Sequence, residues 1–249
     1  VQELFERWDL DAVSIGRVTG DQFARIYDGA HLEAEVPIPL LIEAPRYRTE
    51  SVRPEYLDRL QNASFPAEPK LEEAHSSFKS LLSSPNIASR RSVYRQYDHE
   101  VQTNTVVKPG QGDAAVLRIR ESKKGVAVTV DGNSRFVFLE PYVGGAMAVA
   151  EACRNIACSG ARPVAVTDCL NFGDPSKSDV YYQLEEAVRG MAEACRLLEV
   201  PVVSGNVSLY NETQGQPIFP TPVVGAVGIL EDVSSVVTAG FKSSTDVVL

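Results

Sequence analysis

Residues 202–212 read VVSGNVSLYNE, and the interpretation of the chain starts from this stretch. Val202 and Val203 are β-branched residues, which suit a buried strand. A run of small polar residues, SGN, follows directly, and further hydroxyl, amide and carboxylate groups come after it. We therefore expect the strand to end after Val203 and the polar residues to form a loop.

A second stretch of the same kind, VAVTDCLNFGD, occupies residues 164–174. Its apolar start predicts another buried strand, which ends at Asp168. A long helix is predicted between the two strands, from about residue 179 to residue 198. Its expected buried face is marked by Val180, Leu184, Val188, Met191, Cys195 and Leu198. If the two strands are neighbours in one sheet, both polar loops lie at its carboxyl edge, where α/β sheets commonly bind ligands.

The sequence around these stretches predicts further strands and one more helix. Residues 144–160 are rich in Gly and Ala, which indicates a helix in close contact with a sheet or another helix. Strands and short apolar runs are expected at 116–120, 125–130, 136–139 and 222–230. Helix and strand alternate, so the predicted fold class is α/β or α+β, with a mixed sheet packed with helices.

Four residues of the two polar loops have the chemistry of a site for an anionic ligand and a hard cation. Asp168 supplies a carboxylate, and Asn206 supplies the neutral amide oxygen that Mg²⁺ accepts. Gly205 lets a backbone N–H approach a phosphate, and Ser208 offers a hydroxyl donor. The same residue types are also common in ordinary turns, where they bond to their own backbone, so spacing alone leaves both interpretations open.

Two other groups of residues have side chains that could form a binding or acid–base site. In the loop VVKPGQGD, Lys108 could hold a phosphate and Asp113 a metal, although a turn that flanks a strand explains the loop equally simply. The adjacent pair Asp98-His99 has acid–base chemistry, but neighbouring residues do not face each other, which favours a surface or packing role. The sequence contains no P-loop, G-x-G-x-x-G or G-x-S-x-G motif.

Composition narrows the class of protein. The chain has 249 residues, of which 44% are hydrophobic and 23% are charged, as in soluble globular proteins. Its net charge of −9 argues against a broad nucleic-acid surface, and no apolar run is long enough to predict a membrane span. We expect no secretory signal, because the first residues, VQELFERWDL, are acidic and amphipathic rather than a basic segment followed by an apolar one. We expect a reducing cytoplasm, because the four cysteines form no C-x-x-C pair and do not cluster with the histidines.

The ends of the sequence suggest a piece of a longer polypeptide. There is no initiator Met, and the last residues, STDVVL, read as an unfinished strand. Near the start, a short helix in QELFERW and strands at 23–27 and 31–36 precede Pro37, Pro39 and Pro45. A polar, Pro-rich connector with a helix near 68–82 then leads into the central region.

Several long stretches closely resemble phosphoribosylformylglycinamidine synthase, in particular the small, multi-subunit form of its large subunit. They are FERWDLDAVSIGRVTGD, SPNIASRRSVYRQYDHEVQTNTVVKPGQGDAAVLR, VTVDGNSRFVFLEPYVGGAMAVAEACRNIACSGARPVAVTDCLNFGDP and VVSGNVSLYNETQGQPIFPTPVVGAVG. The family is an ATP-dependent ligase of purine biosynthesis. It converts formylglycinamide ribonucleotide (FGAR), ATP and glutamine-derived ammonia to formylglycinamidine ribonucleotide, ADP and phosphate.

The resemblance implies a domain organisation. The family fold contains two tandem copies of a pair of domains shared with aminoimidazole ribonucleotide synthetase. Residues 1–45 then correspond to the end of the first copy's C-terminal-type domain, and 46–91 to a linker with a helix. Residues 92–232 correspond to the second N-terminal-type, synthetase-like domain, and 233–249 to the start of the second C-terminal-type domain.

The resemblance also implies roles for the four site residues. Asp168 and Gly205 resemble ATP-contacting positions, Asn206 a Mg²⁺ ligand, and Ser208 a substrate contact. The family's first copy carries a Glu-x-His-Asn-His-Pro motif whose second His is the acid–base residue, whereas this chain has DGNSRF at 131–136. We therefore expect the chain to contribute nucleotide, Mg²⁺ and substrate contacts but no catalytic histidine. A glutaminase subunit and a small bridging subunit are the partners that the family implies.

Two alternatives stay open beside this interpretation. The chain could be a non-catalytic, auxiliary nucleotide-binding or scaffolding half of the enzyme. It could also belong to another member of the superfamily, such as a selenophosphate or thiamine-phosphate kinase type, which the strings SGNVSLYNE and DCLNFGD disfavour.

Overall fold

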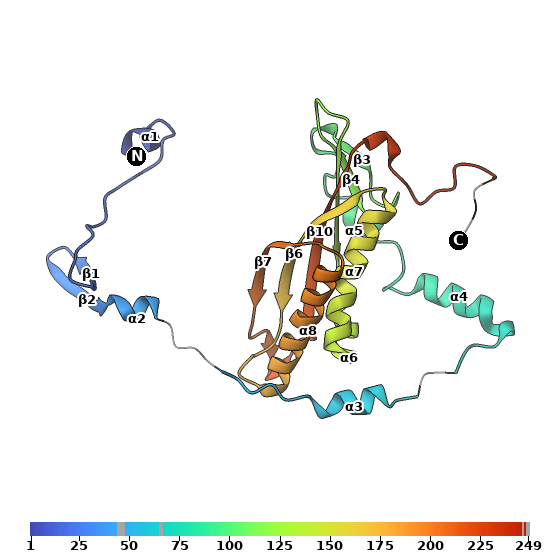
Figure 1. Cartoon of the computed structure of the whole chain (residues 1–249), viewed down its shortest axis with the longest axis horizontal. Coiled ribbons are helices and arrows are strands. Elements are labelled where there is room, and N and C mark those ends of the chain that lie inside the picture. The colour runs from blue at the N-terminus through green and yellow to red at the C-terminus, as the bar shows by residue number, and fades with distance from the viewer. Residues whose placement is uncertain (44–47, 65–66, 246, 248–249) are drawn as a thin grey trace. The chain divides into compact units, whose positions relative to one another are not determined.

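The structure is a computed structural model that describes residues 1–43, 48–64, 67–245 and 247 (Figure 1). The chain divides into two compact units, Val1–Arg48 and Thr49–Leu249. The domain limits that the resemblance implies, after residues 45, 91 and 232, stay predictions. Three prolines, Pro37, Pro39 and Pro45, were expected to end the strand pattern, and Pro45 lies outside the described residues.

The first unit is a small antiparallel hairpin with two short helices. Strands β1 (Phe23–Asp28) and β2 (His31–Pro37) pair, and helices α1 (Gln2–Glu6) and α2 (Ile38–Ile42) flank them. The predicted helix and both predicted strands are confirmed. None of the described residues of this unit is buried, so the unit has no hydrophobic core of its own.

The second unit is built around a six-stranded mixed sheet in the order β3-β4-β5-β10-β6-β7. The pair β6–β7 is parallel, and the other neighbours are antiparallel. The strands are β3 (Thr105–Val107), β4 (Ala115–Arg118), β5 (Gly125–Asp131), β6 (Arg162–Asn171), β7 (Val202–Ser208) and β10 (Thr221–Leu230). The predicted mixed sheet is confirmed, and β7 forms one of its edges.

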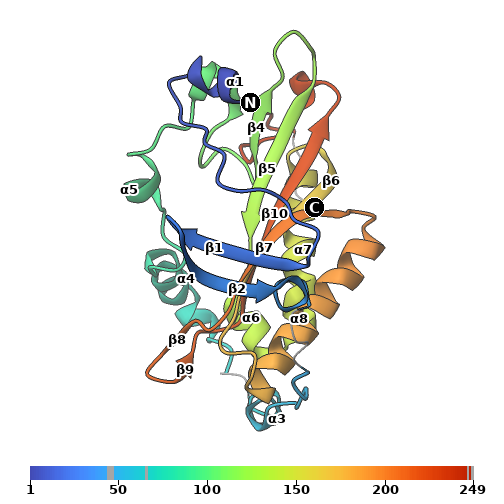
Figure 2. The same ribbon diagram turned by 90° about the vertical axis from the view of Figure 1, so that its left-hand side faces the viewer.

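Helices α7 (Pro141–Cys158) and α8 (Ser178–Leu197) lie side by side against one face of this sheet (Figure 2). Every second residue of β10 is buried, from Pro222 to Leu230, because alternate side chains of a strand point to the same face. The core joins these side chains to Val149 and Ile156 of α7 and Met191 of α8. Neither helix, nor any other in the described part of the chain, is long and apolar enough to cross a membrane.

The two helices pack closely because glycines lie at their contact. A Cβ at Gly190 would collide with the carbonyl oxygen of Tyr142, and one at Gly145 would collide with that of Ala187. The close contact predicted for the Gly- and Ala-rich helix is therefore confirmed. The predicted buried face of α8 is only partly right. Val188 and Leu198 are exposed, and the buried residues of α8 include Gln183, Ala187, Gly190 and Ala194 instead.

Two predicted strand ends are wrong, and one short apolar run is helical. Strand β6 continues beyond Asp168 to Asn171, and β7 continues beyond Val203 to Ser208, because the two polar runs pair with each other in a regular ladder. The apolar run at 136–139 belongs to a helix, α6 (Ser134–Leu139). The side chain of Asn133 caps this helix by accepting hydrogen bonds from the N–H groups of Arg135 and Phe136.

Part of the predicted connector packs on the second unit. Helix α3 (Glu55–Gln61) buries Leu57 completely and stacks the ring of Tyr56 on that of Phe138, with centroids 4.4 Å apart. The predicted helix near 68–82 is present as the 3₁₀ turn η1 (Leu71–Glu73) and helix α4 (Ala74–Ser83). The remaining elements are α5 (Arg91–Tyr94), η2 (Val101–Thr103), β8 (Glu212–Thr213), β9 (Gln216–Pro217) and η3 (Val233–Ser235).

Candidate functional site

The structure brings the four predicted site residues onto two adjacent parallel strands. In the register of β6 and β7, Asp168 pairs with Gly205 and Cys169 pairs with Asn206. Ser208 ends β7 and pairs with Asn171 at the end of β6. The expectation that these strands are neighbours is confirmed. The residues lie within the strands rather than in the loops beyond them, because the polar runs complete the ladder.

The pleat divides these side chains between the two faces of the sheet. Asp168 is on the face covered by α7 and α8, with Val224 of β10 as its neighbour in register. Asn206 and Ser208 alternate with Gly205 and are on the other face. Asp168 and Asn206 therefore do not form a two-residue metal site within this chain.

The structure gives a reason for a glycine at position 205 that the sequence did not reveal. A Cβ at this position would overlap the carboxylate and the carbonyl oxygen of Asp168. The absence of a side chain thus leaves room for the Asp168 carboxylate beside the edge strand. The predicted approach of a phosphate to the Gly205 backbone stays a prediction.

The environment of Asp168 disfavours its charge. The carboxyl group is partly buried, and this burial raises its pKa above the usual value. The buried thiol of Cys195 on α8 has a raised pKa as well, chiefly through burial and also through the charge of Asp168. Among the residues that the structure describes, none donates a hydrogen bond to this carboxylate, which is available to a donor from a ligand.

Ser208 is held by a residue that the sequence analysis passed over. Its hydroxyl lies 3.3 Å from Oδ1 and 3.1 Å from Nδ2 of Asn211. Nδ2 of Asn211 also donates to the carbonyl oxygens of Phe172, at 3.0 Å, and Ser208, at 2.9 Å. The predicted free hydroxyl donor is thus already engaged. The quoted motif contained Asn211, but no sequence pattern distinguished this amide from that of Asn206.

An ion pair ties the two loops together beyond the ends of β6 and β7. Lys177 donates to both carboxylate oxygens of Glu212, at 2.9 and 2.7 Å, and to the carbonyl oxygen of Gly215. Glu212 also accepts from the N–H of Asp174 at 3.1 Å. The Lys177 ammonium group and this N–H hold the pKa of Glu212 below its usual value. The two residues are far apart in sequence, so spacing gave no signal for them.

The residues around Asn206 supply few metal ligands. Within the described ranges there is no group of three or more His, Cys, Asp or Glu side chains that could hold a metal ion. Asn206 is exposed and offers one amide oxygen. Magnesium prefers six oxygen ligands and usually takes several from water and substrate phosphates. One protein oxygen is therefore compatible with Mg²⁺ only when a nucleotide supplies further ligands.

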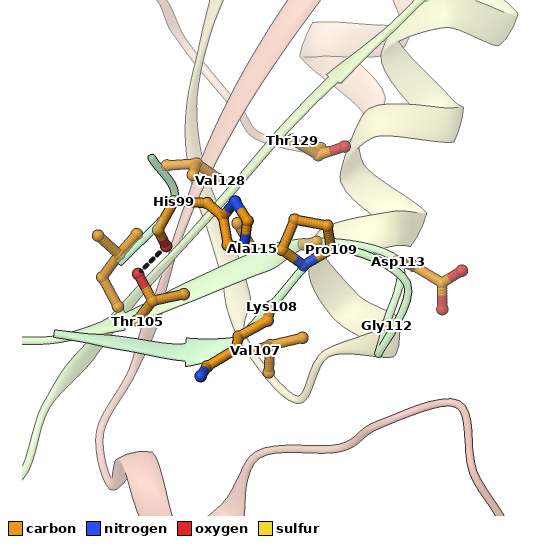
Figure 3. Close-up of a pocket in the computed structure, with 12 residues that line it drawn as sticks. His99, Thr105, Val107, Lys108, Pro109, Gly112, Asp113, Ala115, Val128 and Thr129 are labelled. Atoms are coloured by element: carbon orange, nitrogen blue, oxygen red, sulfur yellow. Dashed lines mark hydrogen bonds between the residues drawn. The ribbon is translucent and has the colours of Figure 1, made fainter. Parts of the chain in front are cut away.

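Lys108 and Asp113 do not form a joint site. They line a cavity of about 310 Å³ together with mainly apolar side chains of β3, β4 and β5. Figure 3 shows the carboxylate of Asp113 directed away from the ammonium group of Lys108. Lys108 instead forms an ion pair with Glu100, with Nζ and Oε1 2.6 Å apart.

His99 has the packing role that was favoured for it. Its ring Nδ1 lies 3.0 Å from the carbonyl oxygen of Tyr97, and the edge of the ring meets Tyr94. Its own carbonyl oxygen accepts a hydrogen bond from Thr105, as Figure 3 shows. Asp98 accepts from the N–H of Glu100 rather than bonding to His99.

Comparisons with known proteins show which proteins this chain is similar to. The family described as AIR synthase related protein, N-terminal domain, matches residues 111–230. Over 251 aligned residues, which cover 100% of this chain, the sequence is 49% identical to phosphoribosylformylglycinamidine synthase subunit PurL of Alkaliphilus metalliredigens. This alignment covers 34% of that protein, so the chain spans about one third of the length of its curated relatives.

Solved structures of Thermotoga maritima PurL have the same fold. The form complexed with ATP matches with a TM-score of 0.62 and 32% identity, covering 87% of this chain and 32% of that one. The form complexed with FGAR matches with a TM-score of 0.63 and 33% identity over the same share of this chain and 32% of that one. Residues 1–249 are therefore a PurL-family sequence that corresponds to one third of its full-length relatives and carries an AIR synthase-type N-terminal domain.

Proposed function

We propose that this chain forms one wall of the active site of an ATP-dependent ligase that makes formylglycinamidine ribonucleotide from FGAR and ammonia. The observation that carries this proposal is the β6–β7 pair, which places Asp168, Gly205, Asn206 and Ser208 on adjacent strands at the edge of the sheet. The relatives complexed with ATP and with FGAR support these two molecules as its ligands.

Each residue has a role that its surroundings permit. ATP binds across the exposed edge of β7, where it contacts the backbone of Gly205 and the carboxylate of Asp168 on one face of the sheet and reaches Asn206 on the other face. The amide oxygen of Asn206 is one ligand of a Mg²⁺ ion, which neutralises phosphate charge when bound. Ser208 contacts FGAR from the same face of the sheet as Asn206.

The reaction is a phosphoryl transfer followed by a substitution. The amide oxygen of FGAR attacks the terminal phosphorus of ATP, and ADP leaves. Ammonia then adds to the activated carbon, and phosphate leaves with the former amide oxygen. In such reactions positioning and charge stabilisation account for most of the catalysis, which is what this wall supplies. The acid–base histidine lies outside residues 1–249, and a glutaminase subunit, with a small bridging subunit, delivers ammonia in the cytoplasm.

The test uses a chimera in which this chain replaces the matching third of A. metalliredigens PurL. We expect FGAR-dependent ATP hydrolysis with ammonia in the parent chimera. Asn206→Leu should lower kcat/KM at least about tenfold, because it removes a ligand of the ion. The exposed Asn86 provides a matched control, since Asn86→Leu makes the same change away from the sheet.

Full activity of Asn206→Leu at every Mg²⁺ concentration would remove Asn206 from the site. The auxiliary alternative is tested by calorimetry on the isolated chain with ADP and Mg²⁺. Tight binding together with an unimpaired Asn206→Leu chimera would favour an auxiliary nucleotide site over the catalytic one.

A further inference from the structure

The side-chain amide of Asn211 joins the ends of the two strands that carry the candidate site. Its Nδ2 donates to the carbonyl oxygen of Phe172, which directly follows β6, and to that of Ser208, the last residue of β7. These bonds are 3.0 and 2.9 Å long. The side chain therefore reinforces the junction of the two strand ends, which the backbone bond from the N–H of Phe172 to the carbonyl oxygen of Ser208 also makes.

These two contacts also determine which way the amide faces. Carbonyl oxygens only accept hydrogen bonds, so the nitrogen of Asn211 has to point towards them. Oδ1 then accepts the proton of the Ser208 hydroxyl at 3.3 Å, and Nδ2 lies 3.1 Å from the same hydroxyl oxygen, so both amide atoms contact it. The rotation of the Ser208 hydroxyl is thus restrained by a group whose own orientation is fixed.

The backbone holds Asn211 in place independently of its side chain. Its N–H donates to the carbonyl oxygen of Phe172, and its carbonyl oxygen accepts from the N–H of Ile218. Tyr210, just before it, has a φ of 61°, in the left-handed region, and donates to the carbonyl oxygen of Gly173. This sharp turn returns the chain over Ser208, so that Asn211 reaches it from three residues away.

We propose that Asn211 is a positioning residue for FGAR, which acts by orienting the hydroxyl of Ser208 and by holding the ends of β6 and β7 together. The proposal rests on the proposed function, in which Ser208 contacts FGAR. Asn211 itself does not need to touch the substrate. Its effect should therefore appear in the binding of FGAR and depend on the presence of the Ser208 hydroxyl.

The experiment measures KM for FGAR and for ATP in the full-length chimera and three single variants, Asn211→Ala, Ser208→Ala and Lys177→Met, together with the double variant S208A/N211A. Lys177→Met is the matched control, because it opens the same two loops without touching Ser208. Thermal unfolding of each variant is recorded in the assay buffer, and all assays are run below the lowest melting temperature.

We expect Asn211→Ala to raise KM for FGAR about tenfold, the value of one hydrogen bond, and to change KM for ATP less than about twofold. Ser208→Ala should have a similar effect. The double variant should match Ser208→Ala alone, because the amide then has no hydroxyl to orient. Lys177→Met should leave KM for FGAR within about twofold of the parent, even where it lowers the melting temperature.

Three outcomes would overturn the positioning role. They are an unchanged KM for FGAR in Asn211→Ala, additive effects in the double variant, and an equal rise of KM in Lys177→Met. The proposed function fails by a different result, namely a parent chimera without FGAR-dependent ATP hydrolysis. If Ser208→Ala alone has no effect, the substrate contact of Ser208 is wrong and the role of Asn211 falls with it.

Discussion

At the scale of single residues, Asp168 is a proposed ATP contact whose ionised carboxyl group lowers the stability of the fold. Its carboxyl group is partly buried, and burial raises its pKa. A carboxyl whose pKa is higher in the folded than in the unfolded state binds protons more readily when folded. Ionised Asp168 therefore destabilises the fold above its folded-state pKa. This penalty disappears below the pKa of the carboxyl in the unfolded chain, about 3.9, because the carboxyl is then protonated in both the folded and the unfolded state.

This linkage predicts that Asp168→Asn increases the free energy of unfolding at pH 7, because the amide is neutral and has the same shape. The gain should shrink as the pH falls towards about 4, where the carboxyl of the parent becomes protonated. Urea unfolding of the chain at pH 7 and pH 4.5 measures the difference. Asp113→Asn, on an exposed loop, is the control for loss of one charge. A variant that is less stable than the parent at pH 7 would show that the carboxylate has a stabilising partner.

At the scale of secondary-structure elements, the contact between α7 and α8 supports the face of the sheet opposite Asn206 and Ser208. The contact depends on glycines that allow backbone atoms of the two helices to touch. A methyl group at Gly190 has no space, because the carbonyl oxygen of Tyr142 occupies it. Alanine is a better helix former than glycine by about 1 kcal/mol, so the measured loss of stability is the cost of crowding reduced by this gain.

We predict that Gly190→Ala lowers the free energy of unfolding by about 1–3 kcal/mol, the usual range for overpacking. Chemical denaturation monitored by circular dichroism gives the value. Gly240→Ala is the control, since a Cβ at Gly240 meets nothing within 4 Å. If Gly190→Ala is more stable than the parent by about 1 kcal/mol, the full gain in helix propensity, the helices can separate without cost and the close contact does not limit stability.

At the scale of the whole molecule, the two units differ in how much they bury. The described residues of Val1–Arg48 include no buried side chain, whereas Thr49–Leu249 contains the entire buried core. An isolated two-stranded hairpin is at best marginally stable in water. We predict that limited trypsin digestion first cuts within the first unit and leaves a stable product that begins near residue 49.

Mass spectrometry of the digest identifies this product, and its melting temperature should equal that of the intact chain. The same product should keep whatever affinity the chain has for ADP with Mg²⁺, because all four candidate residues lie in the second unit. Early cleavage after Arg189 or Arg196, within α8, would contradict this division of stability.

Patterns of polarity along the chain predicted most of the elements. Alternation and helical spacing identified the mixed sheet, α7 and α8, because burial of one face imposes those periods locally. Both strands of the first unit were also predicted, although none of that unit's described residues is buried. Their ends were harder to predict. Strand β7 looked finished at Val203 because its later residues are small and polar, but backbone pairing with β6 extends the strand to Ser208 whatever the side chains are.

The sequence by itself determined the family, the fold class and the chemical types of the candidate residues, since these depend on local composition and on long matching stretches. Only the tertiary structure decided which residues contact each other. Gly205 leaves space for Asp168, Asn211 holds Ser208, and Asp168 and Asn206 point to opposite faces. These relations arise from the register of two strands separated by a 20-residue helix, and nothing within either strand specifies that register.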